Sequence, residues 1–581
     1  MNGLSFGPRL TSDGVTFQLW APAAKRVDVL LDGAAHEMPR DENGWFTREI
    51  TGIGAGARYR FLIDSKTEVP DPASSFQPDD ISGPSEVIDH KSYNWCATDW
   101  RGRPWEDAVF LETHVGTFTP DGTCRAMIGK LDHLVATGIT ALELMPVADF
   151  PGRWNWGYDG ALWYAPDSSY GRPDDLKALI DEAHLRGLMV FLDVVYNHFG
   201  PEGNYLGLYA PSFFSKAQTP WGNAIDYRVP EVRQFAVDNA LHWLRTYRFD
   251  GLRLDAVHAI ETAEDLLLRD ISIAAGALAR SSGRHIHLVL ENDDNRPGLL
   301  DPLTDPPAGK YRAQWNDDYH HAWHVLLTGE TFGYYQDYQP PLPHLVRALE
   351  SGFAYQGEGS AHRDNALRGE PSGHLSPAAF VNFIQNHDQI GNRALGDRLA
   401  AQPAAIDAAL AITLLAPMMP MLFMGEEWGA TTPFPFFCDF QGDLAEAVRK
   451  GRRREYAKAY EAFGDDVPDP IDRATFTSAK LDWQELQSAS GQQRHVLVRK
   501  LLALRHKHIV PHLRTASFGE ASFEADGTLF ASWNLDHHFL TLTANLSPEP
   551  SAKETPGREH MIWGKPGIFA PWGVCWTMEP L

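Results

Sequence analysis

The chain has 581 residues, of which 43% are hydrophobic and 22% charged, and its formal net charge is −25. This length is too great for one compact core and predicts two to four domains. The acidic balance argues against nucleic acid and anionic membrane as partners, and it fits a soluble enzyme with a neutral ligand.

Cysteine usage and the apolar runs indicate the cellular setting. The four cysteines form neither a CxxC pair nor a dense framework, so neither zinc nor a disulfide scaffold is indicated; they are Cys96, Cys124, Cys438 and Cys575. The first residues show no signal peptide pattern. The longest apolar run, 409–424, is interrupted by Pro417 and Pro420, which favours a helix and a buried strand over a membrane span. We therefore expect a reduced, cytoplasmic setting.

Residues 1–90 have the pattern of an all-β domain. Short runs of β-branched, apolar and aromatic residues occur at 15–20, 27–31 and 58–63. Strands at this spacing predict an immunoglobulin-like β-sandwich. Prolines then cluster between 70 and 84 and indicate a linker.

From about residue 104 apolar strands alternate with helical segments. Helices are predicted at 173–186 and 230–247, and strands at 109–112, 139–144, 188–193, 252–255, 285–291, 379–384 and 421–424. A less pronounced eighth strand falls at 313–315. Repeated βα units of this length predict an α/β fold in which a parallel sheet closes as a (β/α)8 TIM barrel. A doubly wound open sheet is the alternative, but no GxGxxG follows the first strand.

The βα rhythm stops after about residue 505. Strand-like runs at 528–533 and 539–543 predict a small C-terminal antiparallel β-domain. The predicted domains are thus an N-terminal β-sandwich at 1–90, a catalytic barrel with inserted loops at 91–505, and the C-terminal β-domain at 506–581.

The stretch around the fourth barrel strand suggests chemistry. Leu252 and Leu254 alternate with Arg253 and Asp255, which places the charged pair on one face of a strand. This stretch alone fits a buried structural salt bridge equally well. The same design recurs, however, at several strand ends, where barrel active sites lie. The polar residues there are Asp193, Asn197, His198, Arg253, Asp255, His258, Glu291, His387 and Asp388.

Three acids, Asp255, Glu291 and Asp388, are expected to converge on one barrel mouth. Converging carboxyl groups suit glycoside hydrolysis, which needs a nucleophile, a proton donor and support for an oxocarbenium-like transition state. Arg253 should lower the pKa of Asp255. Burial after an apolar run should keep Glu291 protonated.

The sequence resembles the α-amylase family of glycoside hydrolases over roughly residues 105–500. The motifs are DVVYNH at 193–198, GLRLD at 251–255, Glu291, and NHD at 386–388, in the family's order. The resemblance implies that Asp255 is the nucleophile, Glu291 the acid/base and Asp388 the transition-state stabiliser. It also implies that the sugar subsite is lined by Tyr158, His198, Arg253 and His387.

A closer resemblance is to the malto-oligosyltrehalose trehalohydrolases within that family. It rests on LETHVGTFTP at 111–120, NHFGPEGNY at 197–205, WNDDYHH at 315–321, NHDQIGNR at 386–393, GEEW at 425–428 and DDVPDP at 465–470. It implies a retaining hydrolase that cuts the α-1,4 bond next to the terminal trehalose of malto-oligosyltrehalose. The expected partner is this maltodextrin-type substrate.

Polar residues past the nucleophile are expected to form the wall on the trehalose side. They are His258, Asp317, Asp318 and His321, followed by Gln389, Asn392 and Arg393. A site that hydrogen-bonds the hydroxyl groups of the trehalose unit rejects substrates that leave its buried polar groups unpaired.

The sequence predicts neither a cofactor nor a metal. Asn197 matches a calcium ligand of the family, but no partner carboxylates are evident nearby. His320 and His321 lack the spacing of a zinc site and are expected at a helix start or the site wall. The alternatives for function are a glycogen branching or debranching enzyme, another glucan hydrolase of the family, or a catalytically silent glucan-binding protein.

Overall fold

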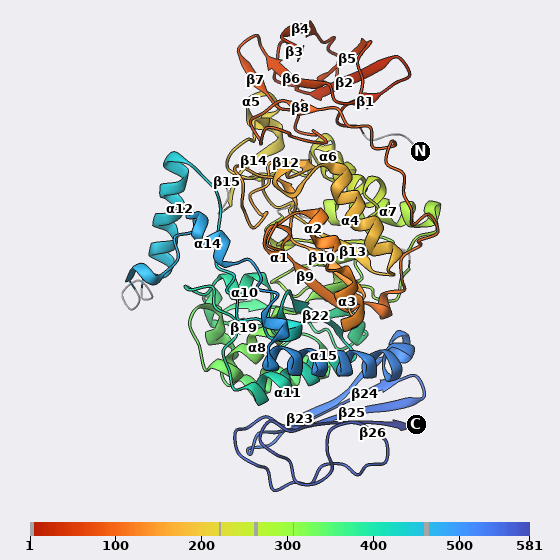
Figure 1. Cartoon of the computed structure of the whole chain (residues 1–581), viewed down its shortest axis with the longest axis vertical. Helices are drawn as coiled ribbons and strands as arrows, with labels where there is room; N and C mark the ends of the chain where they lie inside the picture. The colour runs from red at the N-terminus through yellow and green to blue at the C-terminus, as the bar shows by residue number, and fades with distance from the viewer. Residues whose placement is uncertain (1–4, 220–221, 261–264, 306, 458–463) are drawn as a thin grey trace.

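The computed structural model describes residues 5–219, 222–260, 265–305, 307–457 and 464–581. Figure 1 shows the N-terminal strands at one end, the barrel in the middle and the C-terminal sheet at the opposite end. Among the helices that the structure describes, none is both long and apolar enough to cross a bilayer.

The N-terminal region consists of two antiparallel sheets. One has the order β1-β2-β5, and the other has the order β4-β3-β6-β7 with β8 paired to β6. Phe17 and Tyr59 pack with ring centroids 4.7 Å apart and join the two sheets through their buried faces. The strands are β1 Arg9–Leu10, β2 Gly14–Trp20, β3 Val27–Leu31, β4 Ala34–Glu37, β5 Trp45–Thr51, β6 Arg58–Ile63, β7 Thr67–Val69 and β8 Ser85–Glu86. The predicted β-sandwich is confirmed.

The centre is a closed parallel barrel with the strand order β9-β10-β13-β16-β17-β18-β21-β22. The strands are β9 Phe110–Thr113, β10 Ala141–Leu144, β13 Met189–Val194, β16 Gly251–Leu254, β17 His287–Leu290, β18 Ala313–Trp315, β21 Phe380–Asn382 and β22 Met419–Phe423. The predicted barrel is confirmed, and the less pronounced pattern at 313–315 is a barrel strand.

Helices surround this barrel (Figure 1). They are α2 Cys124–Ile128, α3 Leu131–Thr137, α4 Pro173–Leu185, α6 Pro230–Thr246, α7 Leu266–Ser282, α8 Asp317–Thr328, α9 Pro341–Ser351, α11 Pro403–Leu415 and α15 Ala489–His508. Further elements in the connections are α1 Val115–Phe118, β11 Ala148–Asp149, β12 Leu162–Pro166, α5 Leu206–Tyr209, β14 Phe214–Thr219, β15 Gly222–Ile225, β19 Glu358–Ser360, β20 Ala366–Arg368, α10 His387–Gly391, α12 Gly442–Glu455 and α14 Arg473–Ser478.

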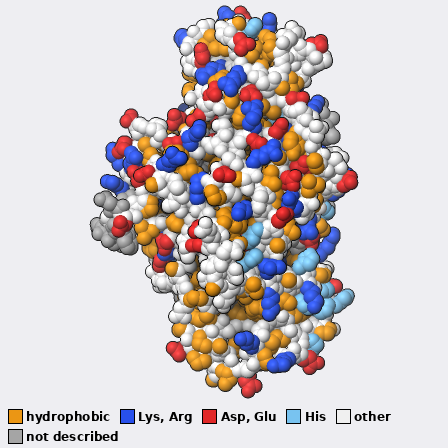
Figure 2. Space-filling view, in the orientation of Figure 1, with side chains coloured by type: hydrophobic (Ala, Val, Ile, Leu, Met, Phe, Trp, Pro, Cys, Tyr) orange, Lys and Arg blue, Asp and Glu red, His pale blue; other side chains and the backbone are white. Residues whose placement is uncertain are grey.

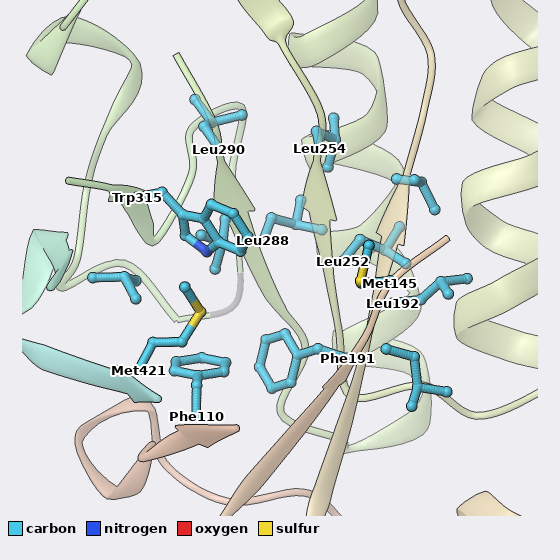
Figure 3. Close-up of a cluster of buried hydrophobic side chains, with 14 of the residues drawn as sticks. Phe110, Met145, Phe191, Leu192, Leu252, Leu254, Leu288, Leu290, Trp315 and Met421 are labelled. Carbon is cyan, nitrogen blue, oxygen red and sulfur yellow. The ribbon is translucent and has the colours of Figure 1, made fainter. Parts of the chain in front are cut away.

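Aromatic side chains fill the N-terminal end of the barrel. Phe110 and Phe191 meet edge to face at 4.9 Å, and Trp105 packs against Phe110 and His287. Figure 3 shows Phe110 and Phe191 with Met421 and Trp315 in this packed interior. Because side chains alternate along a strand, the residue two positions further on faces the same interior, one layer nearer the C-terminal mouth. In β9, β10, β13 and β16 this second layer is charged, and Asp193 and Arg253 belong to it.

The C-terminal sheet docks on the barrel helices. Its order is β23-β24-β25-β27-β26, with β23 Ser517–Phe523, β24 Thr528–Leu535, β25 His538–Asn545, β26 Met561–Trp563 and β27 Val574–Pro580. The buried Trp533 donates its indole N–H to the Leu349 carbonyl of α9, and the buried Trp576 donates to the Ala411 carbonyl of α11. The domain boundaries at 90 and 505 stay predictions, and the second falls within α15.

The molecular surface carries both signs of charge. Figure 2 shows acidic and basic side chains interspersed over the visible face rather than gathered by sign. The net charge of −25 therefore does not form a single-sign field on this face.

Candidate active site

The candidate residues lie at the C-terminal ends of neighbouring barrel strands. Asp193 is in β13, and Arg253 stands opposite it in β16. Asp255 and Glu291 directly follow β16 and β17, and Asp388 lies in α10 after β21. The parallel register brings all of them to one mouth of the barrel.

Arg253 binds three carboxyl groups of the site. Its Nη1 donates to Asp193 Oδ2 at 2.6 Å and to Asp255 Oδ1 at 2.8 Å, and its Nη2 donates to Glu291 Oε2 at 2.8 Å. The guanidinium also lies over the Trp315 ring, 4.1 Å from the centroid. Because Arg253 is 2% exposed, these contacts replace its hydration shell and fix the three carboxyl groups relative to one another.

Asp255 is held as a carboxylate. Burial alone would raise the pKa of Asp255, but the Arg253 guanidinium and the Asn197 amide lower it below its ordinary value. Asn197 Nδ2 donates to Asp255 Oδ2 at 2.8 Å, so each carboxylate oxygen accepts one bond. An ionised, half-buried carboxylate of this kind can act as a nucleophile.

The pKa of Glu291 shifts in the opposite direction. Burial raises the pKa of Glu291 well above its ordinary value, against the effect of Arg253, and the neighbouring carboxyl groups of Asp255, Asp317 and Asp388 raise it further. The amide of Ala256 donates to Glu291 Oε2 at 2.8 Å. Ala256 reaches this position with φ 40° and ψ 50°, a left-handed conformation that non-glycine residues adopt at a cost. A neutral carboxyl group can supply a proton.

Asp388 lies beside a buried ion pair. His387 donates its backbone N–H to Glu112 Oε2 at 2.9 Å, and its Nδ1 lies 2.5 Å from Glu112 Oε1. Burial opposes ionisation of His387, but Glu112 raises its pKa above the ordinary value. Asn386 caps α10 by accepting from the amides of Asp388 and Gln389, which fixes the turn that carries Asp388.

The aromatic ring of Tyr158 lies against the candidate residues. The Tyr158 ring stacks on His387 at 5.1 Å, and the Tyr158 hydroxyl donates to Asp193 at 2.6 Å. His198 Nε2 lies 2.8 Å from the Tyr158 carbonyl oxygen. The half-buried ring can carry the apolar face of a sugar.

The residues expected at the trehalose-side wall differ in burial and in their contacts. Asp317 is half-buried, and burial followed by the charges of Asp293 and Asp388 raises its pKa to about 7. Asn392 donates to Asp388 Oδ1 at 2.8 Å. His258 is exposed, and its Nδ1 accepts from the Asp293 amide at 3.2 Å. Gln389 is buried beside Asp388.

Three wall candidates are engaged within the protein. Asp318, at 1% exposure, accepts from Arg368 and Tyr338 on Oδ1 and from Asn295 and two backbone amides on Oδ2. The expectation that it lines the wall is therefore corrected: it joins α8 to the loops around it. His321 is buried against Tyr334, and Arg393 pairs with Glu330 and Asp397.

The sequence reasoning missed two interior acids, Glu112 and Glu143. Both are 1% exposed and lie in β9 and β10. They carry the signal that marked Arg253 and Asp255, a charged residue alternating with buried apolar ones.

No metal centre is evident in the portion of the chain that the structure describes. There, no group of three or more His, Cys, Asp or Glu side chains is placed to hold an ion. The Asn197 amide bonds Asp255, and its carbonyl oxygen contacts His198 Nδ1, so this side chain is engaged at both ends. The absence of a metal requirement stays a prediction.

Comparison with known proteins gives consistent matches. Residues 98–209 match the alpha amylase catalytic domain family, and residues 5–76 match carbohydrate-binding module 48, the isoamylase N-terminal domain. The chain is 43% identical over 506 residues to the malto-oligosyltrehalose trehalohydrolase of Deinococcus radiodurans, covering 86% of this chain and 82% of that protein. The Mycobacterium tuberculosis H37Rv enzyme of the same name is 40% identical and covers 95% and 96%.

A solved structure covers the whole fold. The crystal structure of a protein from Salmonella typhimurium, assigned as an alpha amylase, superposes with a TM-score of 0.93 at 44% identity. The match covers 99% of this chain and 100% of that one.

Proposed function

The chain belongs to the malto-oligosyltrehalose trehalohydrolases of the α-amylase family, and we propose that it hydrolyses the α-1,4 bond next to the terminal trehalose of malto-oligosyltrehalose. It is a glycosidase. The products are trehalose and a shortened malto-oligosaccharide, so the reaction makes trehalose from maltodextrin.

The proposed reaction proceeds in two steps. In the first, Asp255 attacks the anomeric carbon and forms a glycosyl ester, while Glu291 gives its proton to the departing oxygen of trehalose. In the second, Glu291 takes a proton from water, and that water displaces Asp255 to release the malto-oligosaccharide. Asp388 stabilises the positive charge that develops on the sugar ring in both steps.

The observation that carries this proposal is that two carboxyl groups bonded to one guanidinium have pKa values shifted in opposite directions. Asp255 and Glu291 each lie 2.8 Å from a nitrogen of Arg253, yet their pKa values move in opposite directions. A shared guanidinium keeps the two groups close, which suits the spacing of about 5–5.5 Å in retaining enzymes better than the wider spacing of inverting ones.

The remaining site residues are proposed to bind the sugars. Tyr158 carries the ring of the sugar that Asp255 attacks. The hydroxyl groups of that sugar are hydrogen-bonded by Asp193, Asn197, His198, Arg253 and His387. On the trehalose side, Asp317 is the best-placed partner, because it is half-buried and lies near Asp388 and Glu291. His258, Gln389 and Asn392 extend that wall, and His321 and Arg393 support it from behind.

We propose that the enzyme works in the cytoplasm. All four cysteines belong to the described residues and are unpaired, and Cys96 is exposed. A free exposed thiol persists in a reducing compartment.

The testing experiment compares three substrates: malto-oligosyltrehalose, maltohexaose and amylopectin. Trehalose should be the dominant small product, and the new reducing end should appear first as the α-anomer in proton NMR. Equal hydrolysis of maltohexaose would make the protein an ordinary amylase. Transfer or debranching on amylopectin would favour the branching or debranching alternative, and an initial β-anomer would contradict retention.

A further inference from the structure

Glu143 is a buried acid that the proposed reaction does not use. It lies in β10 between β9 and β13, in register with Glu112 of β9. Its side chain is 1% exposed, and neither carboxyl oxygen has a hydrogen-bond partner within the described chain. A buried carboxylate without partners costs several kcal/mol, so this residue calls for an explanation.

The groups around Glu143 are already paired with others. Glu112 bonds His387, and Asp193 bonds Arg253 and Tyr158 through Oδ2. Asp193 Oδ1 is buried and, within the described residues, lacks a partner, as do both Glu143 oxygens. Among these groups, the buried atoms that lack a partner within the described residues are three carboxyl oxygens and one donor, Arg253 Nε, so unpaired acceptors outnumber unpaired donors.

One proton resolves this imbalance. A protonated carboxyl group offers one O–H donor, whereas a carboxylate offers none. Burial raises the pKa of Glu143 well above its ordinary value, and the charges of Glu112 and Asp193 raise it further against the effect of Arg253.

Resting on the function proposed above, we propose that Glu143 is a neutral carboxylic acid and a positioning residue for Arg253. Its O–H is directed toward Asp193 Oδ1, directly or through one interior water. Asp193 then stays ionised and oriented, and its Oδ2 holds the guanidinium that orders Asp255 and Glu291. An ionised Glu143 would instead compete with Asp193 for Arg253 and pull it away from the catalytic pair.

Two substitutions separate a neutral donor from an ion. Glu143→Gln keeps size, neutrality and a donor, so kcat should stay within about threefold of the wild type and the pH profile should not move. Glu143→Met removes the donor, and kcat should fall about tenfold or more with KM little changed, because small displacements of catalytic groups are costly. Asp193→Asn is the comparison, since it removes a charge that does pair with Arg253.

Infrared spectroscopy tests the proton without substrate. At neutral pH the wild type should show a protonated-carboxyl C=O component that is missing from the spectrum of Glu143→Gln and present in that of Glu291→Gln, which should lack only the contribution of Glu291. A band unchanged by Glu143→Gln would overturn the proposal, as would a loss of activity in Glu143→Gln as large as in Asp193→Asn. The spectrum is independent of the substrate assay, so failure of the trehalose assignment would leave this outcome readable.

Discussion

At the residue scale, the proposed reaction depends on which of two carboxyl groups, Asp255 or Glu291, carries a proton. Arg253 contacts both Asp255 and Glu291, so the guanidinium alone cannot distinguish them. The difference comes from their other neighbours. Asp255 gains the Asn197 amide, whereas Glu291 is buried among the carboxyl groups of Asp255, Asp317 and Asp388. These neighbours shift the two pKa values in opposite directions, which supports the proposed roles of Glu291 as acid and Asp255 as nucleophile.

Neutral isosteres should remove the chemistry and leave the fold intact. Asp255→Asn and Glu291→Gln should each lower kcat by about a thousandfold or more, because a positioned acid or base contributes about 10²–10⁴. The exposed Asp132→Asn is the control: it should leave the rate unchanged and lower the melting temperature little, because its ion pair with Arg186 lies at the surface.

Azide distinguishes the two roles. With a malto-oligosyl α-fluoride, whose leaving group needs no proton, azide should rescue Glu291→Gln and give the α-glycosyl azide. Formation of the β-azide by this variant, or near-native turnover by either variant on the natural substrate, would contradict the assignment.

The loss of activity on the acidic side of the pH profile should follow the protonation of Asp193 rather than that of Asp255. Burial raises the pKa of Asp193 to about 6, whereas that of Asp255 is lowered. As the pH falls, Asp193 is therefore protonated first and loses its charge against Arg253. We expect kcat/KM to fall about tenfold per pH unit below pH 6. A profile that stays flat to pH 4.5 would show that Asp193 does not control activity.

At the element scale, the strand pattern predicted the barrel, and tertiary pairing decided the details of the site. Acids that end apolar strands could be placed at the mouth because parallel strands share one carboxyl edge. Asp317 and Asp318, adjacent in α8, could not be distinguished from the sequence. Only Asp318 meets Arg368, 50 residues away, and the Glu112–His387 pair spans 275 residues. Local periodicity contains no information on such partners.

Gly251 should tolerate no side chain. A Cβ there would lie 2.1 Å from Phe191 Cε1 and 2.6 Å from the His287 carbonyl oxygen, inside the packed barrel. Gly251→Ala should therefore destabilise the protein by about 1–3 kcal/mol or more through overpacking. Gly298→Ala is the matched control, because its Cβ would meet nothing within 4 Å. Equal melting temperatures for the two variants would refute this account.

At the scale of the whole molecule, three parts are joined into one elongated body (Figure 1). The C-terminal sheet is fixed through Trp533 and Trp576, whose rings stack 5.6 Å apart and whose N–H groups reach two barrel helices. This interface is buried and apolar, so the sheet should unfold together with the barrel.

Loss of Trp576 should uncouple that sheet. Trp576→Phe should cost about 1 kcal/mol for the missing hydrogen bond, and Trp576→Ala about 3–5 kcal/mol for the lost ring. Calorimetry should then resolve a separate, earlier transition in the alanine variant. The half-buried Trp563→Phe serves as the control and should change stability by about 0.5 kcal/mol or less. A single unshifted transition in Trp576→Ala would show that the sheet contributes little.

Neither rate nor stability should depend on a metal. The segment between β13 and β16, roughly residues 199–248, lacks clustered acids, and the Asn197 side chain is engaged by Asp255 and His198. Dialysis against a chelator should leave kcat and the melting temperature unchanged. A loss that calcium alone restores would contradict this expectation.

The single guanidinium that serves Asp193, Asp255 and Glu291 also constrains how the site can evolve. Free-energy effects of substitutions at these positions cannot add, since each change alters the field that the other two experience. Lysine in place of Arg253 would offer a point charge instead of a fork and could not satisfy all three groups in one plane. A substitution at Asp317 also belongs to this coupling, because its carboxyl group raises the pKa of Glu291, so a change of specificity on that wall should change the catalytic pair as well.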